Sequence, residues 1–67
     1  MKIFAERLKD LRIEKGVSQS ELSRQTGISQ TSITYWENAL RTPNLEYAAI
    51  LAEYFGVSLG YLAGLEN

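Results

Sequence analysis

The sequence contains no cysteine and no histidine, and its only proline is Pro43. Disulfide bonds, thiolate chemistry, histidine acid–base catalysis and the usual zinc ligand sets are therefore excluded. The apolar runs are only a few residues long, and no charged and then apolar leader follows Met1, so we expect neither a membrane span nor a secretory signal. These absences favour a cytoplasmic protein with no metal and no cofactor.

The chain is short and its charge is unevenly distributed. With 67 residues it has room for one domain, near the lower size limit at which a hydrophobic core alone stabilises a fold. The net charge of −1 by itself argues weakly against a nucleic-acid partner. However, residues 1–42 carry seven basic and five acidic side chains, a balance of +2, whereas residues 43–67 carry three acidic and no basic ones, a balance of −3. A polyanion would therefore meet the N-terminal part.

Residues 18–37, SQSELSRQTGISQTSITYWE, have the pattern of two short helices joined by a three-residue turn. Leu22 is the apolar residue of the first helix, Gly27 suits a left-handed turn position, and Ile33 and Trp36 restore the helical spacing. The pattern predicts a helix-turn-helix whose second helix, about residues 29–37, is the recognition helix. This helix is expected to present five polar residues away from the core: Gln30, Thr31, Ser32, Thr34 and Tyr35.

Helical periodicity and capping residues predict three further helices. The first covers residues 2–15, the fourth follows a loop at 38–44 and covers 45–55, and a short fifth helix begins after Ser58. The inward face of the fourth helix is predicted to consist of Leu45, Ala48, Leu51, Ala52 and Phe55. We therefore expect an all-α, compact five-helix domain spanning residues 1–67.

Arg12 lies on the same predicted helix face as Leu8 and Leu11, where an arginine either snorkels or needs a buried partner. Glu37 follows Ile33 by four residues and so continues the inward face of the recognition helix. We infer an Arg12–Glu37 ion pair that links the first and third helices. The alternative is two unrelated solvated charges.

Ser18 followed by Glu21 is a capping-box arrangement, and Ser29 similarly caps the recognition helix. Gln19 is then held in the first turn of a helix, among outward-pointing N–H groups. This geometry suits a contact with a DNA phosphate, although an ordinary solvated glutamine fits the sequence equally well.

The fourth helix is apolar on more of its surface than a lone surface helix requires. Tyr47, Ile50 and Tyr54 occupy a second face, and other apolar residues lie outside the predicted core. Scattered apolar surface residues are common, but a self-association surface explains the pattern better. The candidate dimer surface comprises Tyr47, Ile50, Tyr54, Leu59, Tyr61 and Leu65.

Together these features resemble the lambda-repressor-like helix-turn-helix family of phage repressors, Cro proteins and related bacterial regulators. The resemblance runs from Leu8 to Leu62 and rests on LKDLR at 8–12, GVSQ at 16–19, ELS at 21–23, TGIS at 26–29, WEN at 36–38, Pro43, and FGVS at 55–58. It implies a five-helix fold and a transcriptional regulator, most often a repressor, that binds a palindromic operator in double-stranded DNA as a homodimer. It also implies bacterial or phage origin and action at the nucleoid. No small-molecule ligand is evident from the sequence.

The resemblance assigns roles to the outward residues. The base contacts implied are Gln30, Thr31, Ser32 and Tyr35. The phosphate contacts implied are Ser18, Gln19, Ser29, Asn38, Arg41 and Thr42. No arginine lies on the recognition face to pair with guanine, which favours a mixed or A·T-leaning half-site.

Three positions depart from the family pattern. Ser23 stands where alanine is usual, Ala39 where glycine often follows the glutamate and asparagine, and Leu40 where a basic residue is frequent. Residues 18–42 carry two basic and two acidic side chains, so few phosphates would be neutralised and the salt dependence of DNA binding should be shallow.

A different class of function remains open. The same fold can serve as a protein-interaction module, such as the antitoxin half of a toxin pair, for which the acidic C-terminal part and the second face of the fourth helix would be suited. An enzyme is disfavoured because no base–nucleophile pair or metal ligand set converges at any recognisable spacing.

Overall fold

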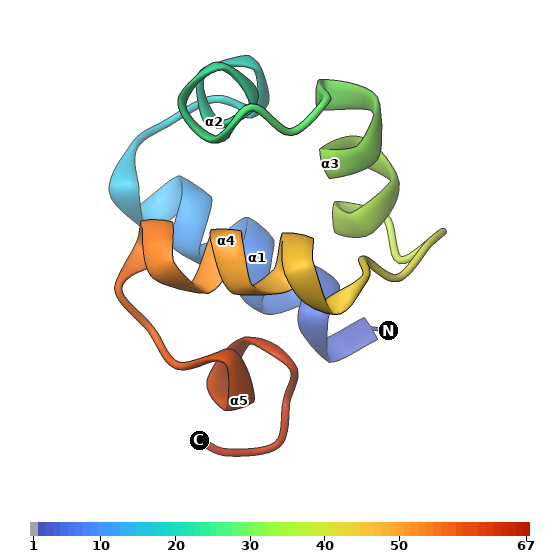
Figure 1. Cartoon of the computed structure of the whole chain (residues 1–67), viewed down its shortest axis with the longest axis vertical. Coiled ribbons are helices and arrows are strands. Elements are labelled where there is room, and N and C mark those ends of the chain that lie inside the picture. The colour runs from blue at the N-terminus through green and yellow to red at the C-terminus, as the bar shows by residue number, and fades with distance from the viewer. Residues whose placement is uncertain (1) are drawn as a thin grey trace.

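The computed structural model describes residues 2–67; Met1 of the predicted domain lies outside the described residues. Five helices and no strand occur in this range. The helices are α1 (Lys2–Lys15), α2 (Gln19–Thr26), α3 (Gln30–Glu37), α4 (Leu45–Phe55) and α5 (Leu59–Leu62). In Figure 1, α4 crosses the middle of the molecule in front of α1, while α2 and α3 lie at one end and α5 at the other. The predicted all-α, five-helix fold is confirmed.

The helices begin where the sequence places capping residues. Ser18, Ser29, Asn44 and Ser58 each accept a hydrogen bond from the backbone N–H three residues later. Such a bond satisfies one of the N–H groups that a helix start leaves without a partner. The four starts are therefore encoded locally.

All five helices contribute to one core. Its fully buried large side chains are Phe4, Leu8, Leu22, Ile33, Leu51 and Leu62. Trp36 is also buried, with its ring edge-on to Phe4 at 6.4 Å between centroids. No helix within residues 2–67 is long and apolar enough to cross a membrane.

The predicted inward face of α4 is partly wrong. Ala48, Leu51 and Ala52 are buried and Phe55 is half-buried, but Leu45 is 72% exposed. Leu45 has the helical phase of Ala48, but it is the first residue of α4 and its side chain is left largely uncovered. Helical phase fixes a direction, whereas burial also requires a neighbour in that direction.

The end of α3 has an unusual backbone conformation. Ala39 has a φ of 59°, and the N–H of Leu40 bonds the carbonyl of Tyr35 at 2.9 Å, as in a Schellman motif. Gly16 and Gly56 occupy the equivalent left-handed positions after α1 and α4. An alanine at this position is strained because its Cβ approaches the backbone. The exit from α3 thus keeps the shape that a glycine would adopt, at some cost in stability.

Candidate nucleic-acid interface

The turn between α2 and α3 is held by side-chain hydrogen bonds as well as by Gly27. Gly27 has a φ of 77°, and the buried Ile28 follows it. The Ser23 hydroxyl donates to the Ile28 carbonyl at 2.5 Å, and the Thr26 hydroxyl donates to the Leu22 carbonyl at 2.7 Å. Alanine could not make the Ser23 bond, so this departure from the family pattern adds a contact across the turn. The angle between the two helices is correspondingly well fixed.

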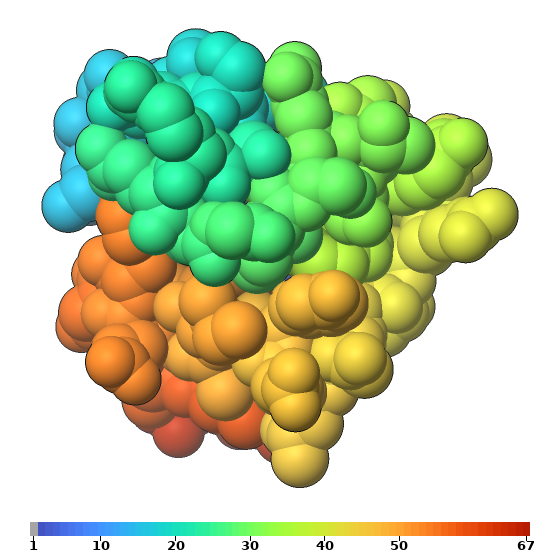
Figure 2. Space-filling view, turned by 45° about the horizontal axis from the view of Figure 1, so that its top comes forward, coloured from blue at the N-terminus to red at the C-terminus, as the bar shows by residue number. Residues whose placement is uncertain are grey.

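The exposed side of α3 begins at its N-terminus. Gln30 and Thr31 are exposed in the first turn and Tyr35 is exposed one turn later. Ser32 is half-buried, and its hydroxyl accepts a hydrogen bond from Ser29 at 2.9 Å. Figure 2 shows α2 and α3 packed side by side, with the loop after α3 projecting at the edge of the molecule. Polar groups from α2, α3 and this loop can therefore meet one extended ligand.

Arg12 and Glu37 join α1 to the end of α3. Arg12 Nε donates to Glu37 Oε2 at 2.6 Å and Nη2 donates to Oε1 at 3.0 Å, while Nη1 donates to the carbonyl of Val17 at 3.0 Å. Their side chains are only 14% and 2% exposed. The hydrogen bonds that Arg12 donates to Glu37, together with the Glu37 charge, raise the pKa of Arg12 against the opposing effect of burial. Because an already high pKa is raised further, Arg12 remains charged at any ordinary pH. Its contribution to stability is lost only as the pH rises through the raised pKa.

Gln19 is not a freely solvated side chain. It is half-buried, its Nε2 donates to Glu37 Oε1 at 3.1 Å, and its Oε1 accepts a hydrogen bond from the Thr34 hydroxyl at 2.7 Å. Thr34 is half-buried as well, as Ser32 is, but neither residue belongs to the buried core. Thr34 lies at the edge of α3 that faces α2, and its hydroxyl meets the Gln19 amide there. Sequence periodicity alone cannot distinguish such an edge position from an exposed one.

The loop after α3 brings a cation next to the recognition helix. Asn38, Arg41 and Thr42 are exposed, and the Arg41 guanidinium lies 4.9 Å from the centroid of the Tyr35 ring. The sequence indicates no arginine on the recognition face, but the left-handed turn at Ala39 allows Arg41 to reach back to it. The other basic residue of the motif, Arg24, forms an ion pair with Glu21 at 2.5 Å. Arg41 is therefore the cation best placed to meet a phosphate.

Three tyrosines of the predicted dimer surface make contacts within the chain. These contacts are Tyr47 with Trp36, Tyr54 with Gln25 and Lys15, and Tyr61 with Arg7. Tyr47 and Ile50 are nevertheless exposed, whereas Tyr54 and Tyr61 are half-buried. The predicted surface divides into this tyrosine-containing part and a second part around Leu59 and Leu65.

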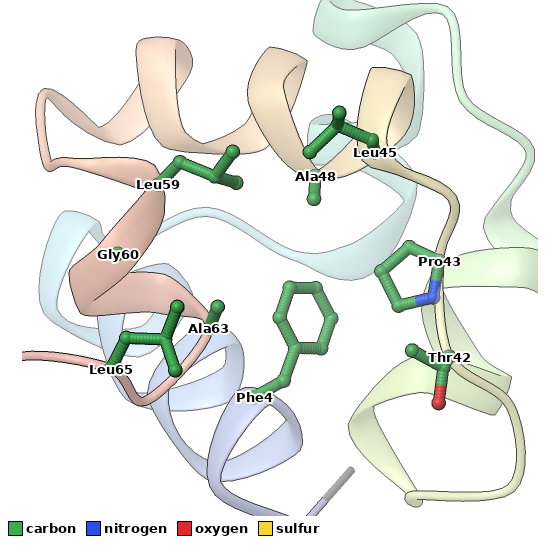
Figure 3. A pocket seen from close by; sticks show the side chains of 9 residues that line it. All are labelled: Phe4, Thr42, Pro43, Leu45, Ala48, Leu59, Gly60, Ala63 and Leu65. Carbon is green, nitrogen blue, oxygen red and sulfur yellow. The ribbon is translucent and has the colours of Figure 1, made fainter.

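The second part surrounds an apolar cavity of about 360 Å³. Figure 3 shows side chains from α1, the loop before α4, α4, α5 and the C-terminal residues around this space. The lining residues are Phe4, Thr42, Pro43, Leu45, Ala48, Leu59, Gly60, Ala63 and Leu65. Leu45 is 72% exposed and Leu65 is 84% exposed. The cavity is therefore bordered by leucines that are largely uncovered.

A family model described as helix-turn-helix matches residues 8–62. The chain belongs to this helix-turn-helix family. The match confirms the lambda-repressor-like resemblance, and it covers α2, the turn and α3 together with most of the supporting helices.

The named relatives include an activator and a repressor. The chain is 34% identical over 96% of its length to the HTH-type transcriptional activator BcrR of Enterococcus faecalis, covering 31% of that protein. It is 28% identical over 90% of its length to the cryptic phage CTXphi transcriptional repressor RstR of Vibrio cholerae, covering 54% of it. It is 30% identical over 97% of its length to the uncharacterised HTH-type transcriptional regulator YobD of Bacillus subtilis, covering 58% of it.

This helix-turn-helix chain thus spans from about a third to just over half of the length of those relatives. No solved structure matches the chain significantly.

Proposed function

We propose that this chain is a sequence-specific, DNA-binding transcription regulator that inserts α3 into the major groove. The observation that carries the proposal is the exposed polar first turn of α3, held at a fixed angle to α2 by the Ser23–Ile28 hydrogen bond. A recognition helix reads base edges with the residues near its N-terminus, which are the exposed ones here. Its place of action is the bacterial cytoplasm, at chromosomal or phage DNA.

The proposed base contacts are the exposed residues Gln30, Thr31 and Tyr35 and the half-buried Ser32. Gln30 can both donate to and accept from adenine in the major groove, and the Thr31 methyl can contact the thymine methyl. The proposed phosphate contacts flank them: Ser18, Gln19, Ser29, Asn38, Arg41 and Thr42. With Arg41 as the main cation, few counterions would be released, so the affinity should fall only gradually with salt.

We further propose that the regulator acts as a homodimer on a palindromic operator and that the dimer forms through the cavity face, meaning the cavity together with Leu45 and Leu65. In a two-fold dimer, an exposed leucine of one subunit can enter the cavity of the other, and the reverse contact follows by symmetry. Thr42 belongs both to the cavity lining and to the loop proposed to contact DNA. A second subunit on this face would therefore lie beside the same DNA. This arrangement is needed if the two recognition helices are to bind half-sites about one helical turn apart.

Repression is the action that needs least beyond DNA binding, because a dimer that occupies an operator already excludes polymerase. The relative RstR is named a repressor, whereas BcrR is named an activator. We therefore propose repression, to be tested by the effect of deleting the regulator on transcription from the promoter beside its operator. A fall in transcription after deletion would instead identify an activator.

Selection of binding sites from a random duplex pool, followed by titration of the selected duplex, tests the proposal. We expect an enriched palindrome and a complex that survives excess random-sequence duplex at two salt concentrations. The cavity face also suits a second candidate, a module that binds another protein. Failure to enrich any sequence, with binding either absent or indifferent to sequence, would contradict the DNA-reading proposal and favour that candidate.

A further inference from the structure

We propose that Thr34 is a positioning residue for DNA binding: its hydroxyl, together with the Glu37 carboxylate, fixes the Gln19 amide so that one N–H remains directed to a phosphate. This inference rests on the proposed function and deepens it. It assigns a role to a residue of the recognition helix that does not itself contact DNA.

The first step concerns which end of the Gln19 amide faces Glu37. Glu37 Oε1 accepts from Gln19 Nε2 at 3.1 Å and from Arg12 Nη2 at 3.0 Å. Turning the amide over would place its oxygen against a carboxylate oxygen, and neither atom could donate. The Glu37 charge, held in place by Arg12, therefore selects the orientation with the NH₂ group toward Glu37.

The second step concerns the other end of the amide. The Thr34 hydroxyl donates to Gln19 Oε1 at 2.7 Å. A threonine in a helix can instead donate to the carbonyl four residues earlier on its own helix, as Thr26 does with Leu22. The Thr34 hydroxyl instead donates from α3 to a side chain of α2. The Gln19 amide is therefore held at its oxygen by Thr34 and at its nitrogen by Glu37.

The third step is a count of donors. An amide NH₂ group has two N–H bonds, and the contact with Glu37 uses one of them. Gln19 is only half-buried, so the other N–H can reach an acceptor outside the chain. Gln19 is also the first residue of α2, where backbone N–H groups lack intrahelical partners. This cluster of donors suits a phosphate oxygen. Because the side chain is already ordered, binding avoids the entropy loss of fixing a flexible glutamine, which is worth about two- to tenfold in affinity.

The test compares Thr34→Val, which keeps the shape but removes the hydroxyl, with Thr34→Ser, which keeps the hydroxyl. Dissociation constants are measured for the duplex selected by the wild-type chain and for a random-sequence duplex. We expect Thr34→Val to bind both duplexes about fivefold more weakly and Thr34→Ser to bind within about twofold of wild type. An equal loss on both duplexes distinguishes a phosphate contact from a base contact, because phosphates carry no sequence information.

The decisive comparison repeats Thr34→Val in a chain that carries Gln19→Ala. If Thr34 acts through Gln19, removing its hydroxyl has no further effect in that background. Circular dichroism of each variant confirms that the helices are intact. Binding by Thr34→Val at wild-type strength, or an undiminished loss in the Gln19→Ala background, overturns the inference while leaving the proposed function standing. If the wild-type chain selects no duplex, the proposed function fails and the inference fails with it.

Discussion

Arg12 on α1 and Glu37 at the end of α3 are joined by two hydrogen bonds of 2.6 Å and 3.0 Å. Because α3 carries the exposed residues proposed to read DNA, this pair fixes the recognition helix to the rest of the fold. The same carboxylate also accepts a bond from Gln19. One buried acidic residue thus connects α1, α2 and α3.

Replacement of Glu37 by glutamine should therefore destabilise the chain severely. The substitution leaves the Arg12 charge buried without its partner, which costs about 3–5 kcal/mol. Chemical denaturation followed by the fluorescence of Trp36 measures the loss. The matched control is Glu14→Gln, an exposed acidic residue on α1, for which we expect a change within about 0.5 kcal/mol. A loss well below ~1 kcal/mol for Glu37→Gln would mean that the pair does not stabilise the fold in this way.

Replacement of Ala39 by glycine should stabilise the chain. Ala39 has a φ of 59°, a conformation that costs an alanine about 1 kcal/mol relative to glycine. We expect the free energy of unfolding to rise by somewhat less than that amount, because glycine also increases the conformational entropy of the unfolded chain. Ala49→Gly, at an exposed position within α4, should instead lower stability by about 1 kcal/mol. If both substitutions are destabilising, Ala39 is not strained.

Gln30→Ala and Gln19→Ala should weaken DNA binding in different ways. The first removes a proposed base contact, so we expect a loss of about 1–3 kcal/mol on the selected duplex and relaxed preference at one base position. The second removes a proposed phosphate contact and should weaken all sequences alike. Repeating binding-site selection with each variant separates the two effects. An unchanged base preference for Gln30→Ala would remove this residue from the reading surface.

Leu65→Glu should abolish self-association without unfolding the chain. Leu65 is 84% exposed and lines the cavity, so a carboxylate there would be buried without a partner in the proposed dimer. Sedimentation with and without the selected duplex measures the oligomeric state. Ile13→Glu, at a 59% exposed residue that does not line the cavity, is the control and should leave the dimer intact. Persistence of the dimer in Leu65→Glu would place the interface elsewhere.

The starts of α2 to α5 could be predicted because each of them carries its own chemical signal. Ser18, Ser29, Asn44 and Ser58 cap the helices that follow them, and these signals depend on only a few neighbouring residues. The Arg12–Glu37 pair could be inferred because both residues share the helical phase of core residues. Local signals and helical phase therefore account for most of the fold.

The parts that could not be predicted depend on distances between elements. Thr34 lies at the edge of α3, and only the closeness of α2 turns its hydroxyl toward Gln19. Leu45 has an inward phase, but no neighbouring helix covers it. The contact of Arg41 with Tyr35 follows a left-handed turn at an alanine, which residue type does not suggest. Periodicity therefore does not predict the burial of residues at the edge of a helix face or in the first turn of a helix.

Locating the DNA interface on the folded chain tests most directly whether α3 reads DNA. Backbone amide chemical shifts, recorded by NMR as the selected duplex is added, report which residues meet DNA. We expect the largest changes at residues 18–20, 29–35 and 38–42, and much smaller ones for the same amount of random-sequence duplex. Largest changes on α4 and α5, with residues 29–35 unaffected, would contradict the claim that α3 reads DNA.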